Sequence, residues 1–160
     1  MVRGAGSLVV LACLGCGDGP EAKGEASPRL EIGVGRTSFA PMPTEGATLE
    51  VFCGLQGLHH AYVSARIECR QEQPVEVRFT LAGSDGAVLA RGGRASTPPC
   101  LQGWAAIAGV PIFFGQWSAR VPTTGSLQAE TISPLPSGAA HDARFVSTAP
   151  SALPCGAADP

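Results

Sequence analysis

The chain has 160 residues, of which 15% are charged, and its formal net charge at pH 7 is −2. This length leaves room for one compact domain with tails. The near-neutral charge and the lack of any run of Lys and Arg exclude an electrostatic surface for nucleic acid, because proteins that bind it cluster cations against the phosphates.

The first residues have the parts of an export signal. Arg3 lies in a short N-terminal region, the apolar run SLVVLACLG follows, and a small residue and a cysteine end it. The run is too short to span a bilayer, which takes about 20 apolar residues. The later apolar stretch WAAIAGVPIFF (104–114) is also too short and contains Pro111, so we expect no transmembrane helix.

The end of this run resembles a bacterial lipoprotein signal, in which a leucine-containing tripeptide that closes with Gly or Ala precedes a lipidated Cys. Gly15 stands before Cys16 and GDGPEAKGEASP follows as a polar tether, although Cys13 occupies the place where Leu is usual. The resemblance implies a signal peptide at 1–15, several acyl chains on Cys16 and a tether over 16–28. Two alternatives stay open: Cys13 as the anchor, and cleavage after Ala26 to release a soluble protein.

The cysteine count favours Cys16 as the anchor. Six cysteines stand at positions 13, 16, 53, 69, 100 and 155, and export to an oxidising compartment favours disulfides. Loss of Cys13 with the signal and lipidation of Cys16 would leave four cysteines, enough for two bridges. A zinc site is disfavoured, because outside the signal no two cysteines have the short spacing of zinc ligands.

From residue 29 the chain alternates apolar and polar residues, as half-buried β-strands do. The pattern predicts strands at 29–34, 48–53, 60–69 and 75–81, a hairpin turn at Asp85-Gly86 followed by AVLAR (87–91), and later strands at 104–114, 126–132 and 143–147. In the clearest of these strands we expect one set of residues to face inward: Ala61, Val63, Ala65, Ile67 and Cys69. The alternate residues are expected to face outward: His60, Tyr62, Ser64, Arg66 and Glu68.

No stretch has the period of a helix, and 21 Gly and 14 Pro disfavour long helices. The sequence therefore predicts an all-β domain over 29–155, an antiparallel immunoglobulin-like β-sandwich of seven or eight strands, with a tail at 156–160. We expect Phe79, Phe113 and Trp104 to fill its core, and Trp117 to be exposed.

The strand model also predicts the disulfides. A hairpin of 47–53 with 60–69 separates Cys53 from Cys69 by about 30 Å at strand rise, whereas a disulfide needs Cα atoms within about 7 Å. Following the strands up and down leads to the pairs Cys69–Cys100 and Cys53–Cys155.

Residues 34–69 carry a further pattern. It consists of Gly35 and Phe39, the turn Gly54, Gln56 and Gly57, and then His60, Tyr62 and Arg66. This pattern, with the closing segment 126–148, resembles uncharacterised lipoproteins of myxobacteria and related deltaproteobacteria. The resemblance implies an exported β-sandwich lipoprotein and carries over no catalytic residue.

The adjacent imidazoles His59 and His60 could bind copper or zinc, with His141 and Asp142 as further ligands. Adjacent strand residues point to opposite faces, however, which disfavours a site that uses both. Hydrolase motifs such as GxSxG and HExxH are missing.

The sequence therefore predicts a non-enzymatic, cofactor-free module of the bacterial cell envelope. A lipid would hold it on the membrane, and it would bind an envelope protein or a glycan through residues such as Gln56, His59, His60 and Trp117. A periplasmic metal-binding protein that uses His59, His60 or His141 is the alternative, and a small hydrolase is less favoured.

Overall fold

The computed structural model describes residues 28–43, 46–54, 57–115, 123–132 and 139–152, and the strands there account for all of its regular secondary structure. The strands are β1 (Leu30–Val34), β2 (Ala40–Pro41), β3 (Ala47–Cys53), β4 (His59–Glu68), β5 (Val75–Gly83), β6 (Val88–Ser96), β7 (Cys100–Leu101), β8 (Trp104–Phe114), β9 (Thr124–Thr131) and β10 (His141–Pro150). The predicted all-β class is confirmed. The two shortest strands, β2 and β7, were not expected from the alternation.

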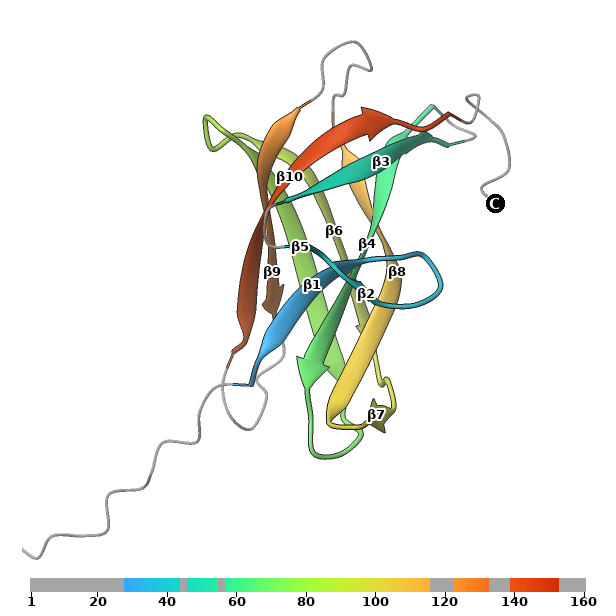
Figure 1. Cartoon of the computed structure of the whole chain (residues 1–160), viewed down its shortest axis with the longest axis vertical. Coiled ribbons are helices and arrows are strands. Elements are labelled where there is room, and N and C mark those ends of the chain that lie inside the picture. The colour runs from blue at the N-terminus through green and yellow to red at the C-terminus, as the bar shows by residue number, and fades with distance from the viewer. Residues whose placement is uncertain (1–27, 44–45, 55–56, 116–122, 133–138, 153–160) are drawn as a thin grey trace, which may run out of the picture.

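Seven of the strands close into a barrel (Figure 1), in the order β3, β4, β8, β6, β5, β9, β10 and back to β3. The ladders around this circuit are antiparallel except for β3 with β10, which is parallel. Strand β1 adds to the edge of β4, and β2 adds to β1. The expectation of an entirely antiparallel arrangement is therefore wrong for one ladder.

The barrel closes through two short ladders. Strands β3 and β4 pair only through Phe52 with His60 and Cys53 with His59, and β6 and β8 pair only through Ala90 with Phe114 and Arg91 with Phe113. Beyond its paired residues, β6 is held to β8 by a side chain: the Arg94 guanidinium donates to the carbonyl oxygens of Ala108 and Gly109 at 2.8 and 3.2 Å. The other five ladders of the seven-stranded circuit are longer and form the two broad sides of the barrel.

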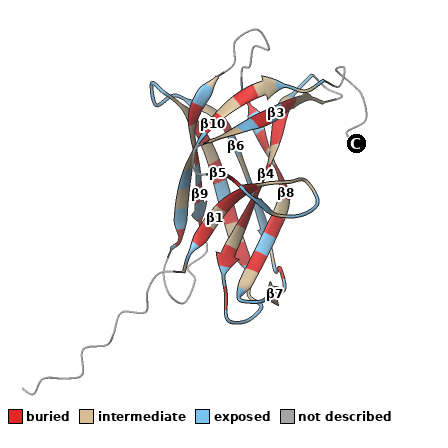
Figure 2. Cartoon of the chain, viewed as in Figure 1, coloured by how far each residue is buried: buried red, intermediate tan, exposed pale blue. Residues whose placement is uncertain are grey.

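The core lies inside the barrel and follows the predicted alternation (Figure 2). The inward-facing set of β4 is buried as expected, and so are the alternate residues of β5: Val75, Val77, Phe79 and Leu81. Burial of each of these β5 side chains contributes about 1.5–3 kcal/mol. The predicted turn is also confirmed, since Gly86 has φ +80° and Asp85 accepts a hydrogen bond from the Ala87 N–H at 3.0 Å.

Four residues differ from the expected burial. His60 and Ser64 are buried although they were expected at the surface. Phe113 is 49% exposed and Trp104 is half-buried, although both were expected in the core. Ser64 is covered because β1 lies along β4 and the serine hydroxyl donates to the Val34 carbonyl at 2.9 Å.

The predicted Cys69–Cys100 disulfide is present, with a Cα–Cα distance of 6.0 Å, and it joins the end of β4 to β7. Cys53 is also disulfide-bonded. Its expected partner Cys155, and the anchor candidates Cys13 and Cys16, lie outside the described residues.

A carboxylate links β1 to β10, although no ladder joins these two strands in the described part of the chain. Asp142 Oδ2 accepts a hydrogen bond from the Ile32 N–H of β1 at 2.9 Å and lies 3.0 Å from Arg144 Nη2. The side chains of Asp142 and Arg144 are only 15% and 24% exposed. Among the described residues, the Arg144 Nε atom is buried without a hydrogen bond, and Asp142 pairs with the same guanidinium group through Nη2.

We predict that Asp142→Ala lowers the free energy of unfolding by about 2–3 kcal/mol, because it removes a charged acceptor and leaves the Arg144 charge partly buried and uncompensated. Urea denaturation measures this. Glu130→Ala is the control: its ion pair with Arg78 is 3.7 Å long with both side chains more than half exposed, so we expect a loss below about 0.5 kcal/mol. Equal losses in the two variants would contradict the role of Asp142.

Candidate aromatic binding surface

Four rings gather on the outside of the barrel where β3, β4 and β8 pair. The ladders place Phe52, His60 and Phe113 in one row across the three strands. The ring centroids lie 5.9 Å apart for Phe52 and His60 and 6.0 Å apart for His60 and Phe113. Tyr62, two residues along β4, meets the His60 ring edge-on at 5.2 Å. We call Phe52, His60, Tyr62 and Phe113 the aromatic surface.

The aromatic surface is exposed at its rim and buried at its centre. His60 is 8% exposed, whereas Phe113 is 49% exposed and the neighbouring Leu58 is 53% exposed. The predicted outward direction of His60 thus holds, but its neighbours' rings cover it. Ring pairs of this kind stabilise by about 0.5–1.5 kcal/mol beyond the area they bury. His60 therefore acts in this surface as a packed ring.

Arginine side chains lie over the rings on this side of the barrel, from the aromatic surface to the start of β1. Arg36 lies over the Tyr62 ring at 4.8 Å. Further along β4, Arg66 lies 4.3 Å from the Trp104 centroid and 4.9 Å from that of Phe39. Trp104 is thereby held at the surface instead of in the core.

An acidic residue fixes this second group. Glu31 Oε2 lies 2.6 Å from Arg66 Nη2, and Glu31 Oε1 lies 2.9 Å from Arg29 Nη2. Arg29 in turn lies over the Trp104 ring at 5.6 Å. Because Glu31 and Arg66 face each other in the β1–β4 ladder, backbone pairing brings the two side chains together and favours the ion pair.

The structure does not bring the proposed histidine ligands together. Pro150 at the end of β10 pairs with Val51, next to Phe52, which pairs with His60. His141 stands at the opposite end of the ten-residue strand β10, which amounts to roughly 30 Å at strand rise. Within the described ranges, no group of three or more His, Cys, Asp or Glu side chains could hold a metal ion.

The other residues that the sequence singled out are placed only in part. His59 is half-buried and pairs with Cys53 across the β3–β4 hairpin. Gln56 and Trp117 lie outside the described residues. Two hollows lie beside His141, one lined by residues that include Arg78, Thr80 and Glu130 and the other by residues that include Glu31 and Arg144.

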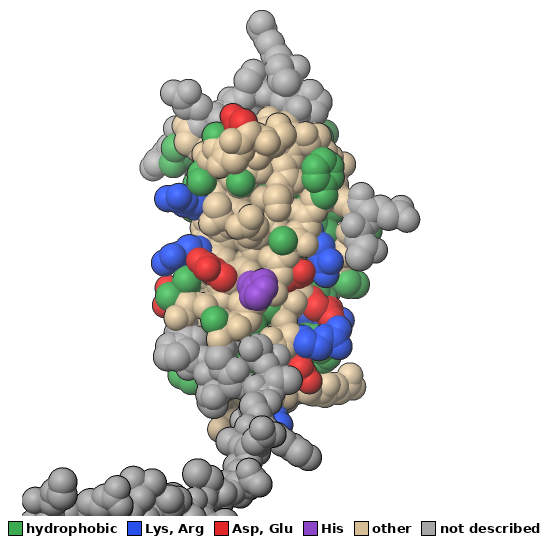
Figure 3. Space-filling model, turned by 90° about the vertical axis from the view of Figure 1, so that its left-hand side faces the viewer, with side chains coloured by type: hydrophobic (Ala, Val, Ile, Leu, Met, Phe, Trp, Pro, Cys, Tyr) green, Lys and Arg blue, Asp and Glu red, His purple; other side chains and the backbone are tan. Residues whose placement is uncertain are grey.

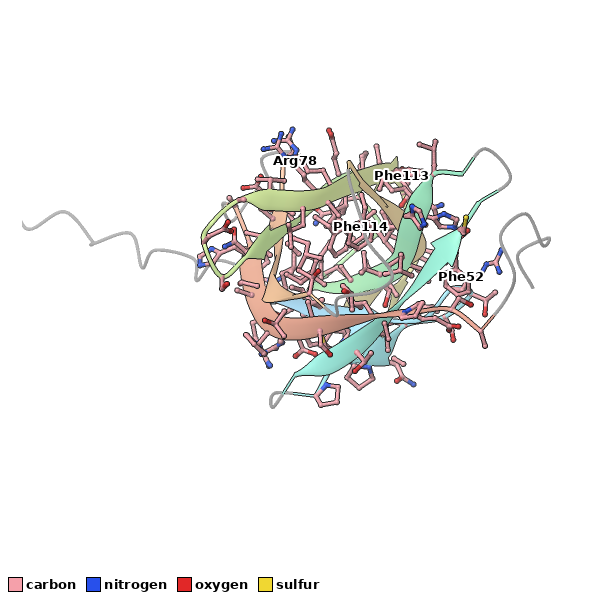
Figure 4. The ribbon with its side chains drawn as sticks, turned by 90° about the horizontal axis from the view of Figure 1, so that it is seen from above. Phe52, Arg78, Phe113 and Phe114 are labelled. Atoms are coloured by element: carbon pink, nitrogen blue, oxygen red, sulfur yellow. A yellow bond between two sulfur atoms is a disulfide. The ribbon has the colours of Figure 1, made fainter. Side chains whose placement is uncertain are left out.

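Sequence reasoning did not single out Phe52 or Arg29, and it placed Phe113 in the core. The available signal was the period of two: Phe52 alternates with the inward Val51, and Phe113 lies between the buried Ile112 and Phe114. Figure 4 shows the result from above, with Phe114 inside the ring of strands and Phe52 and Arg78 on different sides of its exterior.

No helix in the described part of the chain is long and apolar enough to cross a membrane. The comparisons with known proteins found no matching family model, no matching curated protein and no matching solved structure. The fold and the surface chemistry therefore carry the functional argument.

We predict that Phe113 contributes little to stability. Phe113→Ala should lower the free energy of unfolding by less than about 1 kcal/mol, since half of the ring is already in water. The matched control is the adjacent Phe114→Ala, which removes a ring that is 5% exposed and should cost about 3–5 kcal/mol. Urea denaturation of both variants distinguishes them, and a comparable loss in Phe113→Ala would mean that this ring belongs to the core.

Proposed function

We propose that this protein is a non-enzymatic binding module of the bacterial cell envelope, held on a membrane by a lipid on Cys16, and that its aromatic surface binds a protein partner. The observation that carries the proposal is the exposed Phe113 and Leu58 beside Tyr62 and its arginine. Aromatic residues and Arg are the side chains enriched where protein interfaces have most of their binding energy.

The orientation of the domain supports this assignment. The tether would join the domain at residue 28, before Leu30, and Leu30 pairs with Ile67 near the end of β4. His60 lies seven residues earlier in that strand, which is roughly 23 Å at strand rise. A lipid on Cys16 would therefore leave the aromatic surface at the end of the domain away from the attachment point, where a partner can reach it.

A protein partner is favoured over a glycan at this surface. Sugars stack on open ring faces, but here the Tyr62 face carries Arg36 and the Trp104 ring lies beside Arg66 and Arg29. Guanidinium groups laid on rings and exposed apolar edges suit the carboxylates and apolar side chains of a protein. A metal-binding role has no comparable support, since His60 and His141 lie at opposite ends of the barrel.

We also propose that the barrel is a closed variant of the immunoglobulin-like sandwich. One broad side has β1 antiparallel to β4 and β4 antiparallel to β8. The other has β3 parallel to the last strand, followed by β9, β5 and β6. Grouped this way, the strands form two facing sheets, and the two-pair ladders β3–β4 and β6–β8 are the corners that join them.

The lipid anchor is tested at the mature N-terminus. In a bacterium that processes lipoproteins, mass spectrometry should find an N-terminal acylated Cys16, and Cys16→Ser should move the protein out of the membrane fraction. Cys13→Ser is the matched control and should stay in that fraction, because Cys13 is lost with the signal. An N-terminus at Ser27 without lipid would overturn the anchor.

The binding surface is tested by site-specific photocrosslinking. A photoreactive phenylalanine analogue at position 113 should give a discrete protein adduct in intact cells, whereas the same analogue at Leu101, which is 67% exposed, should give none. Tyr62→Ala should reduce the adduct at position 113 at least tenfold, as expected when an interface anchor is removed. Equal adducts at positions 113 and 101 would count against the aromatic surface.

A further inference from the structure

A second surface lies on the other broad side of the barrel, where β5, β9 and β10 run side by side. Their registers align three outward-facing rows: Arg78, Glu130 and His141; Thr80, Gln128 and Ala143; and Ala82, Ser126 and Phe145. Figure 3 shows this side of the molecule, with a histidine between acidic side chains and basic side chains on both flanks. We call these three rows the polar face.

The polar face has a hollow beside the small side chain of Ala143. The hollow has a volume of about 290 Å³ and is lined by Arg78, Thr80, Gln128, Glu130 and His141, together with Ala129, Asp142 and Ala143. Strands lie about 4.8 Å apart and the three rows span about 13 Å along them. The polar face is therefore long enough for two linked sugar rings.

The side chains around the hollow have hydrogen-bonding capacity to spare. Arg78 and Glu130 are 54% and 56% exposed and approach each other only to 3.7 Å, which is too long for a strong hydrogen bond. Gln128 and His141 are also exposed. Donors such as Arg78 and acceptors such as Glu130 lie side by side here. This arrangement suits a neutral ligand whose groups both donate and accept hydrogen bonds.

An exposed aromatic ring ends the polar face. Phe145 is 59% exposed. Gly46 lies next to this ring and has no side chain. A Cβ atom added at Gly46 would lie 3.6 Å from Phe145 Cδ1. Gly46 itself therefore does not cover the ring.

We propose that the polar face is a saccharide-binding site, with Phe145 stacking against the apolar side of one sugar ring and Gln128, Arg78, Glu130 and His141 bonding the hydroxyl groups of the next. Sugars combine an apolar ring face with hydroxyls that donate and accept, and this matches a single exposed aromatic beside a hollow with mixed polar side chains. The site shares no residue with the aromatic surface, so the protein could bind an envelope glycan and a protein together.

The proposal is tested by calorimetric titration of the full mature protein, solubilised in detergent, with three probes: maltotetraose, cellotetraose and the tetramer of N-acetylglucosamine. At least one should bind. Phe145→Ala should then weaken its binding at least tenfold and Gln128→Ala at least threefold, with unchanged melting temperatures. Leu101→Ala is the control, because it removes a side chain that is 67% exposed and lies in neither surface, and it should bind the saccharide as the native protein does.

Absence of binding by all three tetrasaccharides would overturn the proposal, as would native affinity in both Phe145→Ala and Gln128→Ala. Loss of saccharide binding in Phe113→Ala alone would place the sugar on the aromatic surface instead. These outcomes do not depend on the crosslinking at position 113, so the saccharide site and the protein-binding surface can fail separately.

Discussion

The edge of β4 is shared by two strands, and the rest of the structure depends on this sharing. A strand edge can pair with only one neighbour at each point. Here β3 takes the first two residues of β4, and β1 takes Ser64 to Ile67. Strand β3 must therefore find other partners for its remaining backbone groups, and it finds them in the parallel ladder with β10. That ladder joins β3 to β10 and so to β9, β5 and β6, and it brings the last strand next to the first half of the chain.

The closed barrel separates two kinds of surface chemistry. On the β1–β4–β8 side, rings and guanidinium groups lie against one another, and backbone pairing holds Glu31 opposite Arg66. On the β5–β9–β10 side, polar side chains surround a hollow and Phe145 lies open. Both surfaces use outward positions of strands whose inward positions form the core, so the candidate binding residues and the core residues alternate along the same segments.

The period of two predicted the strands and most of the core, because it depends only on which side chains enter the barrel. It could not predict the burial of His60, since that residue faces outward and is covered by rings from β3 and β8, whose position depends on pairing between distant segments. Trp104 was expected inside on the basis of residue type, but its register opposite Glu68 points it outward, where arginines cover it. The Cys69–Cys100 bond was accessible from sequence because strand length separated Cys53 from Cys69 and the up-and-down course of the strands placed the loop with Cys100 at the end where Cys69 lies. The barrel closure was not, because nothing local marks β3 as a partner of β10.

The parallel ladder between β3 and β10 also constrains how the chain reaches its fold. Thr48 and Ser147, whose hydroxyl groups lie 3.0 Å apart across this ladder, are 99 residues apart in the sequence. A chain that emerges from its N-terminus cannot complete the barrel until nearly all of it has appeared, and contacts of such separation slow folding. During that interval β3 has backbone groups without their final partners, a state prone to aggregation. The time between emergence of β3 and arrival of β10 is thus the period in which this domain most needs protection from its neighbours.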